Sequence, residues 1–173
     1  MEVAILDKAS LRIKSKHTNF IVDPFENLSK TPTDAVLILS GKNADLSKVT
    51  DYRVVIKSPG EYEVGGVKIS AIDIDGSTVY GLTVDNIDIL LAKTSSVTKV
   101  SEKLREYQIA IFNVDSEINQ TVVTALEPRV VILYGEKATD AAKALGKEDA
   151  QVLQKFSAFE DKLPEEMQVV VLR

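Results

Sequence analysis

The side chains that most often bind a catalytic metal are nearly missing from this chain. Its 173 residues include one histidine, His17, and no cysteine. A catalytic zinc ion takes about three protein ligands, usually His, Cys or a carboxylate. Thr18 and Asn19 follow His17, and such neighbours favour a turn. We therefore expect His17 to be an exposed turn residue, and the sequence does not supply the usual zinc ligands.

Oxygen-bearing side chains are the remaining candidates for chemistry. Ser95-Ser96 suggests a nucleophile, but a nucleophilic serine needs a base, and no histidine is near it in the sequence. The run 73–77 is too short for a calcium loop, and turn acids explain it better. Carboxylates are plentiful, so a Mg²⁺ or Ca²⁺ site built from oxygen ligands stays open. The aspartates concerned are Asp7, Asp45, Asp73, Asp75, Asp85 and Asp88.

Charge and composition narrow the classes of partner and compartment. The formal net charge is -5 and the pI is about 5.0, which argues against nucleic acid, because phosphate binding requires a basic face. No apolar run approaches the ~20 residues that span a bilayer. The N-terminus lacks the basic start of a signal peptide. We expect one soluble, cytoplasmic domain over residues 1–173, with neither nucleic acid nor membrane as a partner.

Short strands joined by turns dominate the first half of the chain. The continuous apolar run 35–39 is typical of a strand buried on both faces. Gly65-Gly66 and Asp85-Asn86 are two-residue signals of tight hairpins. The pattern predicts strands near 3–6, 10–14, 20–22, 35–39, 54–56, 61–64, 67–72, 77–84 and 87–92.

The second half of the chain alternates strands with helices. Ser116 is a candidate N-cap for one helix, and Gly146 is placed to end another. Strands first, followed by strands that alternate with helices, predict two sheets with helices outside them. We expect helices over 97–107, 118–126 and 138–145, and strands over 109–114, 130–133 and 169–172.

Four segments carry a resemblance to a known family. The most specific is 58–69, Ser-Pro-Gly-Glu-Tyr-Glu-Val-Gly-Gly-Val-Lys-Ile. Segments 19–25 (Asn-Phe-Ile-Val-Asp-Pro-Phe), 127–132 (Glu-Pro-Arg-Val-Val-Ile) and 163–172 support it. Together they resemble the metallo-β-lactamase superfamily, in its short bacterial branch of metal-dependent hydrolases. The resemblance implies an α/β (α+β) fold, a four-layered αβ/βα sandwich of two mixed β-sheets flanked by helices.

The resemblance also implies metal ligands, and this chain has lost most of them. Family members carry His-x-His-x-Asp-His after the strand that matches 35–39. This chain has Gly-Lys-Asn-Ala-Asp-Leu there, at 41–46, so only Asp45 keeps a ligand type. A Gly-His pair near the start of the family pattern is Asp7-Lys8 here.

The remaining ligand positions show the same loss. The loop 72–77, where the resemblance places a third histidine, has none. The aspartate that bridges two metals falls near Thr94, and the last histidine falls near Gly135. Hydrolysis in the family depends on metal-bound water, whose pKa falls to about 7. We therefore predict no catalytic residue, no metal ligand and no cofactor, and the sequence favours a chain without enzyme activity while leaving that open.

What remains is a set of candidates for a vestigial pocket. A positive charge from Lys8 or Lys42 would repel a cation and favour a small anion such as phosphate or carboxylate. The alternative is that both lysines are solvated surface residues. The full candidate set is Lys8, Ser40, Lys42, Asn43, Asp45, Thr94, Tyr134 and Glu136.

Three functions follow from these observations. The first is a degenerate, non-catalytic binding or interaction module, whose partner is a small anion or a protein not named by the sequence. The second is a hydrolase with an oxygen-ligand or metal-free site, in which Asp45 would converge with Asp7, Thr94 or Glu136. The third is a structural subunit of a homo- or hetero-oligomer, associating through outer helices or through an edge strand at 169–172.

Overall fold

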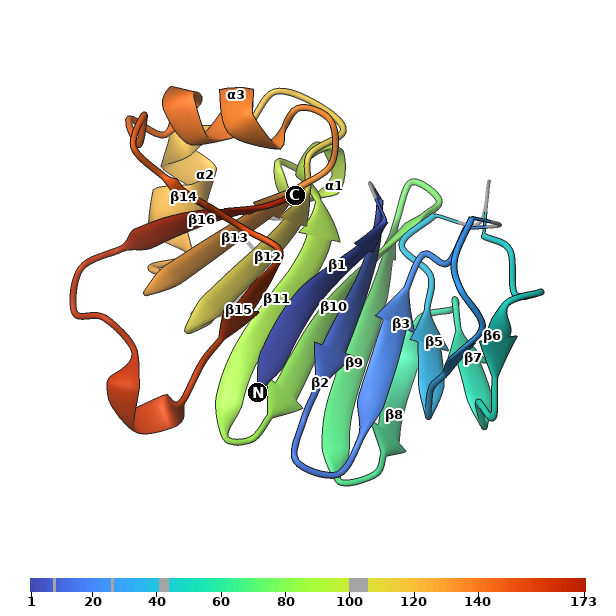
Figure 1. Cartoon of the computed structure of the whole chain (residues 1–173). Coiled ribbons are helices and arrows are strands. Elements are labelled where there is room, and N and C mark those ends of the chain that lie inside the picture. The colour runs from blue at the N-terminus through green and yellow to red at the C-terminus, as the bar shows by residue number, and fades with distance from the viewer. Residues whose placement is uncertain (8, 26, 41–43, 100–105) are drawn as a thin grey trace.

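Two mixed β-sheets face each other across an apolar core (Figure 1). The structure, a computed structural model, describes residues 1–7, 9–25, 27–40, 44–99 and 106–173. The first sheet has six strands, in the order β15 (Lys155–Ser157), β1 (Glu2–Asp7), β2 (Ser10–Lys14), β3 (Asn19–Val22), β5 (Ala35–Leu37) and β7 (Val54–Ile56).

The second sheet has eight strands and a parallel half. Its order is β14 (Gln151–Leu153), β16 (Gln168–Leu172), β13 (Val130–Tyr134), β12 (Ile109–Asn113), β11 (Ile87–Lys93), β10 (Ser77–Val84), β9 (Val67–Ile74) and β8 (Gly60–Val64). Strands β8 to β11 pair antiparallel, whereas β11, β12, β13, β16 and β14 pair parallel. Parallel neighbours end at the same edge, so the carboxyl ends of β11, β12 and β13 meet at one rim of the sandwich.

Tight hairpins account for the antiparallel half. Gly65 and Gly66 both have positive φ, at 56° and 81°, and Asp85 and Asn86 have φ of 51° and 65°. Two successive residues with positive φ form the type of turn whose twist matches a two-residue hairpin. The turns predicted at these two dipeptides are confirmed, with Val64 paired to Val67 and Val84 to Ile87.

The helices in the described part of the chain cover the outer face of the second sheet (Figure 1). The helices on that face are α1 (Thr94–Val97), α2 (Gln120–Ala125) and α3 (Ala138–Ala144). A short 3₁₀ turn, η2 (Glu160–Lys162), lies away from it. The outer face of the first sheet is covered by a small cluster that includes Leu28 and Val49, beside the strand pair β4 (Thr31–Pro32) and β6 (Val49–Thr50). The predicted layered sandwich of two mixed sheets is confirmed.

Several details differ from the sequence-based expectation. Helix α2 is capped by Asn119, whose side chain accepts from the backbone N–H groups of Thr121 and Val122, so the cap predicted at Ser116 is wrong. Strand β16 lies inside the second sheet, between β13 and β14, so its predicted edge position is wrong too. Residues 169–172 form a continuous apolar run that is buried throughout, which is typical of an inner strand, and β16 pairs with β13 on one side and β14 on the other. Most of the helix expected over 97–107 lies outside the described residues.

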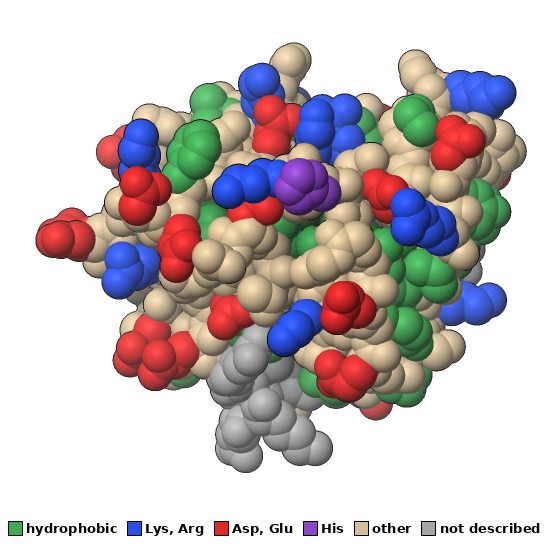
Figure 2. All heavy atoms as spheres, turned by 90° about the horizontal axis from the view of Figure 1, so that it is seen from below, with side chains coloured by type: hydrophobic (Ala, Val, Ile, Leu, Met, Phe, Trp, Pro, Cys, Tyr) green, Lys and Arg blue, Asp and Glu red, His purple; other side chains and the backbone are tan. Residues whose placement is uncertain are grey.

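The end of the sandwich opposite that rim carries mixed surface charge. Figure 2 shows acidic and basic side chains interspersed on it, with His17 exposed among them. His17 lies in the bend between β2 and β3, as predicted, and its backbone N–H donates to Ser15 Oγ at 3.2 Å. None of the helices in the described part of the chain is long and apolar enough to span a membrane.

Candidate functional site

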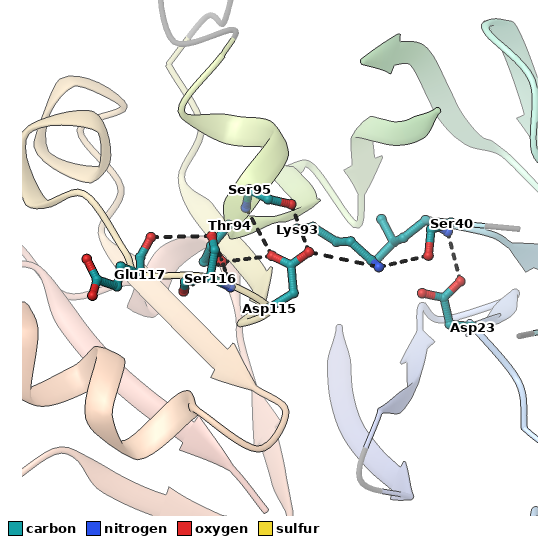
Figure 3. Close-up of polar contacts among 9 residues, drawn as sticks. Asp23, Ser40, Lys93, Thr94, Ser95, Asp115, Ser116 and Glu117 are labelled. Atoms are coloured by element: carbon teal, nitrogen blue, oxygen red, sulfur yellow. Dashed lines mark hydrogen bonds and ion pairs between the residues drawn. The ribbon is translucent and has the colours of Figure 1, made fainter. Parts of the chain in front are cut away.

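A lysine joins the two sheets at the rim where β5 and β11 end (Figure 3). Along β11, Ile89 and Leu91 face the core between the sheets, while Leu90 and Ala92 face the helices. Because side chains alternate along a strand, Lys93 continues the inward face. Its Nζ donates to Ser40 Oγ at 2.7 Å and lies 4.0 Å from Asp115 Oδ2. The Lys93 side chain is only 19% exposed.

Asp115, in the loop after β12, holds the start of α1 in place. Its Oδ1 accepts from Thr94 Oγ1 and from the Ser95 backbone N–H, both at 3.0 Å, and its Oδ2 accepts from Ser95 Oγ at 2.7 Å. Burial would raise the pKa of Asp115, but the hydrogen bonds from Ser95 and Thr94 and the charge of Lys93 outweigh it and lower that pKa. Asp115 is therefore ionised at neutral pH and neutralises Lys93.

Asp23 is the buried carboxyl group of this rim. It follows β3, has a positive φ of 42° and is 6% exposed. Its Oδ1 accepts from the Leu39 backbone N–H at 2.8 Å, which ties the end of β3 to the end of β5. Burial raises the pKa of Asp23 to about 6, against the opposing effects of the backbone N–H groups of Leu39 and Ser40 and the charge of Lys93.

Tyr134, the last residue of β13, brings a buried hydroxyl group to the same region. The residue is fully buried, and its Oη makes no hydrogen bond of normal geometry with any described residue. Burial raises the pKa of Tyr134 well above its ordinary value, and the negative charge of Asp23 adds to this effect. The Asn113 side chain lies close enough to lower the same pKa. The hydrogen-bonded groups around Lys93 therefore lie beside a Tyr134 hydroxyl group that makes no hydrogen bond of normal geometry with a described residue.

A cavity of about 480 Å³ opens next to Tyr134, between the ends of β1, β13 and β16. Gly135, which has a φ of +101°, lies on its wall. A Cβ built on Gly135 would lie 3.5 Å from Asn113 Oδ1, an ordinary van der Waals contact, so the positive φ and not crowding accounts for glycine there. Asp7 and Glu136 line the same cavity.

Solved structures identify this arrangement of sheets, although no protein-family model and no curated protein sequence matches the chain. A Thermotoga maritima protein described as a zinc-dependent hydrolase of the metallo-β-lactamase superfamily superposes with a TM-score of 0.78. The two chains are 22% identical, and the match covers 99% of this chain and 97% of the other. The chain has the metallo-β-lactamase fold.

Two further structures with this fold match over nearly their whole length. A protein described as a metal-dependent hydrolase from Parabacteroides distasonis has a TM-score of 0.64 at 15% identity, with 99% of this chain and 93% of that chain covered. An isothiocyanate hydrolase from Delia radicum gut bacteria has a TM-score of 0.61 at 11% identity, with 99% and 96% covered. At such identities the likeness establishes the metallo-β-lactamase fold and leaves the activity to the residues at the rim.

The donor set at this rim does not fit the metal centre of such hydrolases. The family resemblance places a metal-bridging aspartate near Thr94, where this chain has no acid, and the neighbouring Lys93 donates to Ser40. Asp115 is already committed to Ser95, Thr94 and Lys93. In the described part of the chain, no three His, Cys, Asp or Glu side chains come close enough to hold a metal ion.

The structure brings together some of the residues predicted from the sequence and separates others. Ser40, Thr94 and Tyr134 lie at the rim, and Glu136 lines the adjoining cavity. Asp45 is half-buried, and its carboxylate accepts from the Ser47 backbone N–H, which lowers its pKa. Asp45 is not among the residues that line the cavity with Asp7 and Glu136. Lys8, Lys42 and Asn43 lie outside the described residues.

Sequence reasoning missed three residues of this rim: Lys93, Asp115 and Asp23. The period-2 alternation from Ile89 to Lys93 was a usable signal, because it places Lys93 on the core face. Asp23 is part of the Asp-Pro segment that pointed to the fold. For Asp115 the sequence holds no comparable signal, because its partners Thr94 and Ser95 lie 20 to 21 positions away.

Proposed function

We propose that this chain is a non-catalytic binding module, in which the Lys93 ammonium group takes the space where hydrolases of this fold bind metal. The observation that carries the proposal is the position of Lys93 Nζ, 2.7 Å from Ser40 Oγ and 4.0 Å from Asp115 Oδ2, across the gap between the two sheets. The ammonium group supplies a fixed positive charge to the ionised Asp115 without any metal.

Electrostatics supports the proposal. A divalent cation placed beside Lys93 would be repelled by a charge that cannot move far, because the lysine side chain is largely buried. The cation would also need to displace Lys93 from Asp115, whose carboxylate already accepts hydrogen bonds from Thr94 and Ser95. This step has no compensating set of imidazole ligands, since the only histidine is at the opposite end of the sandwich.

The partner of this module is a separate part of the proposal. The small-anion prediction rests on Lys8 and Lys42, which lie outside the described residues, so it stays a prediction. Lys93 adds little to it, because Asp115 already neutralises that lysine. Next to the rim, the adjoining cavity of about 480 Å³ leaves room for a ligand.

Metal content and calorimetry test the proposal directly. Protein purified without a histidine tag should contain no stoichiometric metal and should give no heat of binding with Zn²⁺, Mn²⁺ or Mg²⁺. The Asp45→Ala and Asp115→Asn variants locate any site that does exist, and Asp140→Asn, an exposed acid on α3, is the matched control. Stoichiometric binding that is lost in Asp45→Ala or Asp115→Asn but kept in Asp140→Asn would overturn the proposal and support an oxygen-ligand hydrolase.

A further inference from the structure

The cavity beside Tyr134 has an apolar floor. Ile5 from β1 is half-buried and supplies the apolar surface, whereas Val171 and Leu172, at the end of β16, are each only 1% exposed. Its volume of about 480 Å³ lies within the usual range for small-molecule sites. The cavity also sits beyond the carboxyl ends of the parallel strands β13 and β16, where ligands commonly bind in such sheets.

The wall of this cavity carries opposite charges that do not satisfy each other. Glu136 and Arg173 both line it and are exposed. No ion pair joins them, and neither forms an ion pair with another described residue. Asp7 adds a second carboxylate to the same lining, and Gln154 adds an uncharged amide. The lining of the cavity therefore combines a carboxylate that can bind a cation, a guanidinium group that can bind an anion, and apolar surface.

From this combination we infer that the cavity binds a small zwitterion with an apolar side chain, of the α-amino acid class. Its ammonium group would face Glu136, its carboxylate would face Arg173, and its side chain would lie against Ile5. A simple anion would meet the carboxylate of Glu136, and a simple cation would leave Arg173 without a counter-charge. The inference rests on the proposed function, because it names the ligand of the same non-catalytic module.

Phenylalanine and its two deletion analogues separate these alternatives. Phenethylamine lacks the carboxylate, and 3-phenylpropanoate lacks the ammonium group, while the apolar part is unchanged. Titrations followed by ¹H–¹⁵N NMR should shift the backbone amides of Gly135, Glu136 and Leu172 with phenylalanine. We expect phenylalanine to bind at least about threefold more tightly than either analogue, because exposed ion pairs contribute modestly.

Charge-removing variants assign each end of the ligand. Glu136→Gln should weaken phenylalanine binding about threefold and leave 3-phenylpropanoate binding unchanged or tighter, because a like charge is removed. Arg173→Gln should weaken phenylalanine binding and leave phenethylamine binding unchanged or tighter. Asp140→Asn, a neighbouring exposed acid that does not line the cavity, should change neither. All three sites are on the surface, and the rest of the NMR spectrum reports whether each variant keeps its fold.

Three results would overturn the inference. Binding of 3-phenylpropanoate as tight as that of phenylalanine, or tighter, would indicate a simple anion site. Binding of phenethylamine as tight as that of phenylalanine, or tighter, would indicate a simple cation site. The third result is no shift of the cavity amides with phenylalanine up to its solubility limit. The metal titrations keep this failure apart from a failure of the proposed function. If the protein binds neither metal nor phenylalanine, only the zwitterion proposal is rejected. If it binds stoichiometric metal at the rim, the proposal of a non-catalytic module is rejected.

Discussion

Two buried tyrosines of the second sheet, both in the core between the sheets, differ in the hydrogen bonds of their hydroxyl groups. The Tyr80 hydroxyl group, on β10, lies 2.8 Å from the Ile38 carbonyl oxygen and 2.7 Å from that of Ile56, and it accepts from the Ile38 N–H at 3.1 Å. The Tyr134 hydroxyl group makes no such bond with a described residue. Both residues are fully buried in the core between the sheets.

The difference separates the part of the molecule that maintains the fold from the part that is available for function. Around Tyr80, polar atoms of one sheet are satisfied by backbone groups of the other, which fixes the spacing of the two sheets. Around Tyr134, an unsatisfied hydroxyl, a carboxyl group of raised pKa and a cavity lie together. Buried polar groups normally have partners, so exceptions concentrate where a structure serves a ligand or a lost active site.

The largest effect should come from ionising Asp23 at the unsatisfied end. Its pKa is raised from 3.8 to about 6, so the folded state holds a proton more tightly than the unfolded chain does. Stability from this group is present at low pH and is lost as pH rises from about 4 through 6, by up to about 3 kcal/mol. Urea unfolding of wild type and Asp23→Asn across pH 4.5 to 7.5 measures it. A constant difference between the two proteins over that window would contradict the raised pKa.

Removing the satisfied hydroxyl should be nearly as costly. Tyr80→Phe leaves carbonyl groups of Ile38 and Ile56 buried without that donor, and we expect the free energy of unfolding to fall by about 1–3 kcal/mol. Tyr62→Phe, which loses an exposed bond to the Ser58 carbonyl, is the control and should change little. If the free energy of unfolding falls no more in Tyr80→Phe than in Tyr62→Phe, the proposed difference between Tyr80 and Tyr134 is wrong.

Lys93→Met should give an intermediate effect. The change removes the counter-charge of Asp115 and the donor to Ser40 while keeping most of the side-chain volume, at a partly exposed site. We expect a loss of about 1–2 kcal/mol in urea unfolding, together with a further rise in the pKa of Asp23. Lys155→Met, which breaks a surface pair with Glu2, is the matched control. An Asp23 pKa that stays the same in Lys93→Met would show that the two groups are not coupled.

The smallest effect is expected for Tyr134→Phe. Because the hydroxyl group has no partner among the described residues, its loss should leave the free energy of unfolding unchanged or raise it, within about 1 kcal/mol. The same denaturation series that includes Tyr80→Phe measures this variant under identical conditions. A loss as large as that of Tyr80→Phe would reveal a hidden partner and place Tyr134 with the structural end.

The local features of this protein follow from its sequence. The dipeptides Gly65-Gly66 and Asp85-Asn86 determine their hairpins, since few residues tolerate two positive φ angles in succession. The apolar run at 35–39 predicted the buried strand β5, and Glu136, close in sequence to the expected last ligand, does lie at the cavity. The loss of imidazole ligands is equally a property of the sequence alone, because no fold supplies a side chain that the chain lacks.

Only the tertiary structure decided which polar and charged side chains lie close together. Lys93 reaches Ser40, 53 positions away, and Glu136 and Arg173 share a cavity through the parallel register of β13 and β16. The pairing of β14 with the other side of β16 places β16 inside the sheet and leaves β14 at the edge. Local pattern determines which face of a strand a side chain occupies, but the partner across the gap depends on how distant strands pair and pack.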